Sequence, residues 1–222
     1  MNPPDTDPDT HAETHAIADA DADFAPAEGG CACGALRYRI EREPLFVHAC
    51  HCTRCQRETG GPFAHHAMVE WTAMTLRAGA PEFVAVPADS GTRHWVARCP
   101  QCRTCVWNEW GSRRAVTRYV RVGTLDEPAR FPPRAHIFAR SRQPWLVLDE
   151  RPGAAPVFDT WYDPAALWPA ASRARHAAAG AAASAAASAA AKTRAKAPAK
   201  SKAKTARAAP PARTRRQPPG TA

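Results

Sequence analysis

Three clusters of cysteines constrain the fold of this chain more than any other feature of its sequence. Together they hold seven of its eight cysteines. They are a C-x-C pair, a C-x-C-x-x-C run and a C-x-x-C pair, formed by Cys31 and Cys33, by Cys50, Cys52 and Cys55, and by Cys99 and Cys102. In a reducing compartment, cysteines spaced this closely bind metal more often than they form disulfides. The clusters therefore predict zinc sites, because zinc prefers four sulfur or imidazole ligands in a tetrahedron.

The first and third clusters together supply the four ligands of a closed site. Glycines around the C-x-C pair permit a kink that turns both sulfurs toward one ion, and a tight turn does the same for a C-x-x-C pair. Joining the pairs gives a structural zinc site on Cys31, Cys33, Cys99 and Cys102. Such a site would close a loop of about 65 residues. It would contribute folding free energy on the order of 10 kcal/mol.

This division leaves the middle cluster with only three protein ligands. Three ligands and an open position are typical of zinc that binds a substrate or takes part in catalysis. Soft sulfur donors also suit an incoming thiolate as the fourth ligand. Two alternatives stay open at this stage. Either the cysteines bind no metal, or a second structural site is completed by Cys105, His48 or His51.

Charge and complexity divide the chain into three parts. Residues 1–28 hold eight acidic side chains and no Lys or Arg, whereas 171–222 hold twelve Lys or Arg and no acidic residue. All cysteines, tryptophans and tyrosines lie in 29–170, which we expect to be the folded domain. The tail lacks aromatic and large aliphatic side chains, so it cannot offset the entropy of ordering. We therefore expect disordered arms at 1–28 and 171–222.

Short β-rich runs between Gly and Pro breaks fill the central part, and no apolar stripe of helical period lasts three turns there. We predict a mainly β domain, a small irregular antiparallel fold stapled by zinc, with helical turns near the ligands and after Pro164. The chain has no apolar run of 18 residues and lacks the basic start and apolar stretch of a secretory leader. We expect no membrane span and a cytoplasmic protein.

Four stretches resemble the glutathione-dependent formaldehyde-activating enzyme family, which includes centromere protein V. They are GGCACGALRY, CHCTRCQRETGGPF, DSGTRHWVARCPQC and HIFARSRQPW, within about 28–160. The resemblance implies an antiparallel zinc-bound fold of β-tent type, with one zinc on the quartet and a second on the trio. It also implies carbon–sulfur lyase chemistry, in which formaldehyde and glutathione interconvert with S-hydroxymethylglutathione.

The sequence departs from the family pattern at two positions. Cys105 is an additional cysteine, and Arg103 stands where the family usually has Gly after the last C-x-x-C pair. A left-handed backbone at Arg103 would cost about 1–2 kcal/mol.

We expect an enzyme in which zinc on the trio holds a substrate thiolate beside an aldehyde carbonyl. Arg54 and Arg57 are candidates to pair with the two carboxylates of glutathione. His51 is a candidate proton shuttle, because an unperturbed imidazole titrates near neutral pH. His65 and His66 are adjacent on an expected strand, so they point to opposite faces and at most one can reach the metal.

Two other functions remain possible on the sequence alone. The basic residues of 192–216 would bind nucleic acid without base readout, by releasing counterions, and the folded domain would then be a scaffold. Alternatively, oxidation of the three-thiolate cluster would release its metal, as in a thiol redox sensor.

Overall fold

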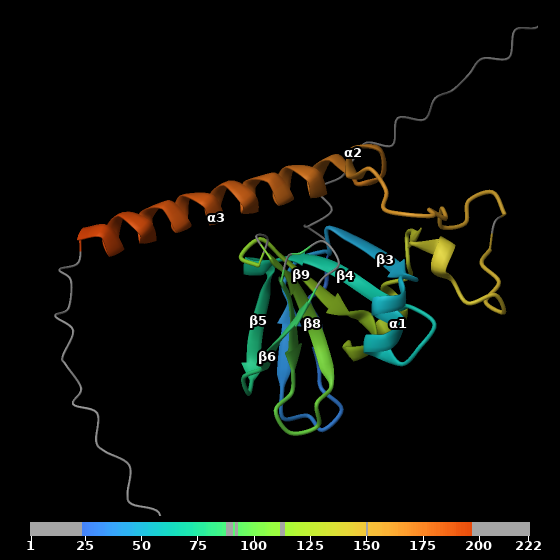
Figure 1. The fold of residues 1–222 in the computed structure, drawn as a ribbon, viewed down its shortest axis with the longest axis horizontal. Helices are drawn as coiled ribbons and strands as arrows, with labels where there is room; N and C mark the ends of the chain where they lie inside the picture. Colours follow the sequence, from blue (N-terminus) through green and yellow to red (C-terminus); the bar gives the residue numbers. More distant parts are fainter. Residues whose placement is uncertain (1–23, 88–90, 92, 112–113, 150, 197–222) are drawn as a thin grey trace, which may run out of the picture. The chain divides into compact units, whose positions relative to one another are not determined.

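The structure confirms the mainly β class. It is a computed structural model that describes residues 24–87, 91, 93–111, 114–149 and 151–196 (Figure 1). Within these residues ten short strands are present. They are β1 (Ala27–Gly30), β2 (Arg37–Ile40), β3 (Phe46–Cys50), β4 (Ala64–Glu70), β5 (Met74–Ala78), β6 (Glu82–Pro87), β7 (Arg93–Arg98), β8 (Cys105–Trp110), β9 (Thr117–Arg121) and β10 (His136–Ile137).

The strands form two sheets. A small sheet has the order β1-β2-β5, and a larger one has the order β10-β3-β4-β9-β8-β7-β6. Every pairing is antiparallel except that of β10 with β3. β3 and β9 are buried along their whole length, as expected of strands covered on both faces.

The core lies where the two sheets meet. Trp107 of β8 packs edge-on against Tyr38 of β2, with ring centroids 6.1 Å apart. Both side chains are almost fully buried. The phenol hydroxyl of Tyr38 shares a 2.6 Å hydrogen bond with the hydroxyl of Thr124, so its one polar atom is satisfied. This contact fixes the small sheet on the large one.

In the part of the chain that the structure describes, three α-helices connect or follow the strands: α1 (Thr53–Thr59), α2 (Pro164–Leu167) and α3 (Ala170–Lys196). The predicted helical turns beside the ligands and after Pro164 are α1 and α2. None of the helices in the described part of the chain combines the length and the apolar character needed to cross a bilayer.

Order extends beyond the predicted domain at both ends. Phe24 packs against Phe131 at a centroid distance of 6.4 Å, so the fold includes residues assigned to the acidic arm. The predicted disorder of 171–222 is corrected over 171–196, which lie in α3. Alanine has the highest helix propensity, and buried contacts of Arg175 with Glu70 anchor the start of the helix. The remaining arm residues, 1–23 and 197–222, lie outside the described part.

Residue contacts divide the chain into a unit of 1–186 and a second unit of 187–222. In the second unit, the described residues are 187–196, the last part of α3.

Candidate functional site

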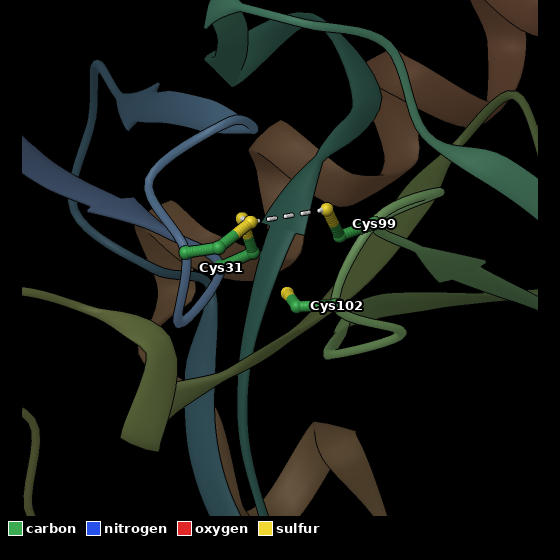
Figure 2. A group of neighbouring side chains, drawn as sticks. Cys31, Cys99 and Cys102 are labelled. Carbon is green, nitrogen blue, oxygen red and sulfur yellow. Dashed lines mark hydrogen bonds between the residues drawn. The ribbon is translucent and has the colours of Figure 1, made fainter.

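The four cysteines of the first and third clusters converge (Figure 2). Their sulfur atoms all lie within 4.8 Å of one another. The distance is 3.5 Å from Cys31 Sγ to Cys33 Sγ and 3.8 Å from Cys33 Sγ to Cys99 Sγ. Sulfurs bound tetrahedrally at 2.3 Å from zinc would be about 3.8 Å apart. The quartet therefore fits a closed four-sulfur metal site.

Two turns from distant parts of the chain build this quartet. One follows β1 and carries Cys31 and Cys33, and the other joins β7 to β8 and carries Cys99 and Cys102. Arg103, in the second turn, adopts the left-handed backbone conformation with φ of 64°. Its amide donates to the carbonyl of Cys99 at 3.0 Å. The turn thus keeps the conformation that favours glycine, and its arginine pairs with Glu82 on the surface.

The three remaining clustered cysteines come together where β3 passes into α1. Cys50 ends β3, Cys52 caps the N-terminus of α1 and Cys55 is buried in the helix. Cys55 N donates to Cys52 Sγ at 3.4 Å, which fixes the cap, and Gly60 ends the helix in the left-handed conformation. The three sulfurs lie within 4.8 Å of one another. The trio is therefore a second group with metal-binding geometry.

Electrostatics favour negative charge on this trio. Hydrogen bonds from the thiols of Cys50 and then Cys55 lower the pKa of Cys52 far below its ordinary value. The contact with Cys52 raises the pKa of Cys50, and the contacts with Cys50 and then Cys52 raise the pKa of Cys55. One of the three sulfurs is thus a thiolate, whereas zinc binds cysteine as thiolate, so metal binding would release the protons of Cys50 and Cys55.

No fourth His, Cys, Asp or Glu of the described chain joins the trio. Cys105 Sγ instead lies 3.5 Å from Glu58 Oε1 and 3.5 Å from Asn108 Oδ1. His51 is turned away, with its Nε2 2.9 Å from Nδ1 of His136. The described residues therefore provide three ligands and no completing side chain.

The trio lies in the wall of a cavity of about 470 Å³. The rest of the wall is largely aromatic, with two histidines and two arginines. The lining residues are His48, Cys50, Cys52, Thr53, Arg54, Cys55, His66, Trp110, Tyr119, Ile137, Phe138, Arg140 and Trp161. Cavities of this size bind small molecules, which would meet the three sulfurs directly.

Comparison with known proteins identifies the family of this chain. The family described as glutathione-dependent formaldehyde-activating enzyme matches residues 26–141, just over half of the chain. The chain belongs to this family. A curated protein of Halomonas elongata that carries the same family description in its name is 24% identical over 133 residues. That alignment covers 56% of this chain and 82% of the relative.

A crystal structure of a Rhodobacter sphaeroides protein also aligns with this family member. It covers 59% of this chain and 98% of the other, with 18% identity and a TM-score of 0.36. The family match ends at 141, yet Trp161 lines the cavity. Residues beyond the shared segment thus form part of the wall in this member.

The structure brings some predicted site residues together and separates others. Arg54 lines the cavity, whereas Arg57 is exposed and lines a different hollow with Gln143. Arg57 follows Cys55 by two positions, which turns it about 200° around a helix. The assignment of Arg57 to the substrate site is corrected for this reason.

The proposed shuttle residue His51 is also corrected. Alternation at the end of β3 points Cys50 and Cys52 to the cavity and His51 to the other side, against His136. Burial lowers the pKa of His51 to about 4, so its imidazole is neutral at pH 7.

Sequence reasoning missed several cavity residues because they come from separate elements. His66 lies on β4, Tyr119 on β9, and Arg140 in the turn after β10. Adjacent strand residues point to opposite faces, so the pair His65–His66 predicted that only one of the two could reach this cavity. His66 lines it, while His65 lines another. The position of Tyr119 and Arg140 in the cavity wall follows only from the order of the strands in the sheet.

Proposed function

We propose that this protein is a zinc-dependent enzyme of the carbon–sulfur lyase type that forms and cleaves a thiol–aldehyde adduct. The proposed adduct is S-hydroxymethylglutathione, formed from glutathione and formaldehyde, in keeping with the family description. The observation that carries the proposal is the trio of cysteines, without a fourth ligand in the described residues, in the wall of a cavity of about 470 Å³.

Each cysteine group has its own part in this proposal. The quartet Cys31, Cys33, Cys99 and Cys102 would hold a structural zinc ion that ties the turn after β1 to the β7–β8 turn. The trio Cys50, Cys52 and Cys55 would hold the second. Zinc on the trio would lower the pKa of a substrate thiol that takes the open position.

The other cavity residues orient the substrate. Arg54 and Arg140 are the two arginines of the wall and would pair with the carboxylates of glutathione. The aromatic side chains exclude water and hold the sulfur beside the carbonyl, so catalysis is mainly positioning. In the forward direction the thiolate sulfur forms a bond to the carbonyl carbon. The C=O π pair moves onto oxygen, which then takes a proton from solvent.

The test uses Cys52→Ser in the full-length protein, with zinc content and adduct turnover measured together. We expect this variant to lose one of two zinc ions and nearly all turnover. Cys105→Ser is the matched control and should keep both ions and most of its turnover, because Cys105 lies outside the trio and a serine hydroxyl can still contact Glu58 and Asn108. Loss of one zinc with unchanged turnover would reject the catalytic role.

The proposed location is the cytoplasm, since none of the eight cysteines forms a disulfide. The domain assignment remains a proposal, with the folded part widened to include 24–28 and the start of α3. Nucleic-acid binding through 192–216 stays a prediction, and 197–216 of that stretch lie outside the described residues.

A further inference from the structure

One histidine of the cavity wall has a buried nitrogen without a partner. His66 is 4% exposed and lines the same cavity as the trio of cysteines. Its Nε2 lies 2.6 Å from NH1 of Arg121, but its Nδ1 has no hydrogen-bond partner. A buried polar nitrogen left without a partner costs about 1–3 kcal/mol, so such groups call for an explanation.

The contact with Arg121 decides which nitrogen carries the proton. A guanidinium can only donate, so Nε2 of His66 must accept. Burial lowers the pKa of His66 well below its ordinary value, and the ring is neutral at pH 7. A neutral imidazole that accepts at Nε2 carries its single proton on Nδ1. The unpartnered atom is therefore an N–H donor.

A chain of contacts holds this ring in place. Arg121 is opposite His66 in the β4–β9 register, and its NH2 lies 2.9 Å from Glu58 Oε1 and 3.3 Å from Asn108 Oδ1. Glu58 belongs to α1, the helix that carries Cys55. The same helix thus positions one sulfur of the trio and, through Arg121, the imidazole ring. Partners of this kind set both the tautomer and the orientation of a histidine.

The two sides of the ring face different surroundings. Arg121 lies on the Nε2 side and lines a separate hollow with Glu58 and His65. His66 lines the cavity of the trio, but its Nδ1 is covered by neighbouring atoms, so a ligand can reach this nitrogen only when binding displaces the side chains that cover it. The ligand atom must be a hydrogen-bond acceptor, because the nitrogen donates.

We propose that His66 is a catalytic residue whose Nδ1–H donates a hydrogen bond to the aldehyde oxygen of the thiol adduct. The assignment rests on the proposed function. When the sulfur lone pair forms the C–S bond, the C=O π pair moves onto this oxygen, and the donor stabilises its negative charge. The oxygen takes its proton from solvent and His66 keeps its own. In the reverse direction, the hydroxyl gives that proton to solvent, the carbonyl reforms and the C–S bond breaks.

Two substitutions separate the donor from the rest of the side chain. His66→Gln can still offer an oxygen to Arg121 but has no donor at the Nδ1 position, whereas His66→Asn places an amide N–H near it. We expect kcat of His66→Gln to fall about 100-fold, as for loss of one oxyanion donor. We expect His66→Asn to stay within about tenfold of the unchanged chain. Both should keep two zinc ions and an unchanged KM for glutathione. Equal, full turnover in the two variants would overturn the proposal.

A spectroscopic readout does not depend on turnover or on the variants folding. In zinc-loaded full-length protein with 15N-labelled histidine, we expect His66 to be the Nδ1–H tautomer. Its Nδ1 proton should shift when glutathione and formaldehyde are added together, and not with glutathione alone. An Nε2–H tautomer, or no shift with the adduct, would overturn the role of His66. A wild-type protein without adduct turnover would reject the proposed function itself, whatever the tautomer.

Discussion

Replacement of Arg175 tests whether the start of α3 is part of the folded domain. Its Nε and NH2 contact the two oxygens of Glu70 on β4 at 2.6 and 2.8 Å, and NH2 also donates to the carbonyl of Glu43 at 2.7 Å. The side chains of Glu70 and Arg175 are 4% and 14% exposed. Removal of one partner of a buried pair costs about 3–5 kcal/mol, because the other charge stays buried. Because Arg175 is partly exposed, we expect a cost at the lower end of this range.

For Arg175→Met we therefore expect the free energy of unfolding to fall by about 3 kcal/mol. In a domain of this size, this lowers the melting temperature by about 6–12 °C. Urea and thermal unfolding with zinc present measure both quantities. Arg173→Met, on the same helix but exposed, is the control and should change stability by less than about 0.5 kcal/mol. Combining Arg175→Met with Glu70→Leu should recover part of the loss. A loss below about 1 kcal/mol for Arg175→Met would refute the reasoning.

Three further outcomes follow from the turns and the quartet. Arg103→Gly should be about 0.5–1 kcal/mol more stable in urea than Arg103→Ala, since glycine removes the left-handed strain but adds unfolded-state entropy. Gly79→Ala should cost more than about 2 kcal/mol, because its Cβ would lie 2.2 Å from the carbonyl oxygen of Ala35. Gly153→Ala, with a similar φ and open space, should cost only about 1–2 kcal/mol. A strong chelator should unfold the zinc-loaded protein cooperatively, and unchanged circular dichroism would contradict a structural role of the quartet.

The sequence was sufficient for the division of the cysteines and for the β class. The spacing of the cysteines indicates which sulfurs can reach one ion, and short runs that alternate apolar and polar residues predict strands. Nearness in sequence to Cys52 and Cys55 also placed Arg54 in the cavity wall, although the same nearness misplaced Arg57. This part of the site, the cysteine groups and Arg54, is set by residues that lie close together in the sequence.

The remaining features depend on contacts between distant segments. His51 adjoins two cavity cysteines in sequence, but strand alternation turns it toward His136, which β10 brings alongside β3. The donor role proposed for His66 depends on the β4–β9 register, which places Arg121 opposite it. α3 was missed because its anchoring residue is a single arginine in an alanine-rich segment without an apolar face.

X-ray absorption at the zinc edge tests the central claim of a closed quartet and an open trio most directly. The two groups offer seven sulfur ligands to two ions. We expect full-length protein with two zinc ions to show one four-sulfur ion and one ion with three sulfurs and a lighter neighbour. Added glutathione should replace that lighter neighbour with an eighth sulfur. A spectrum that shows four protein ligands on both ions, unchanged by glutathione, would contradict the account.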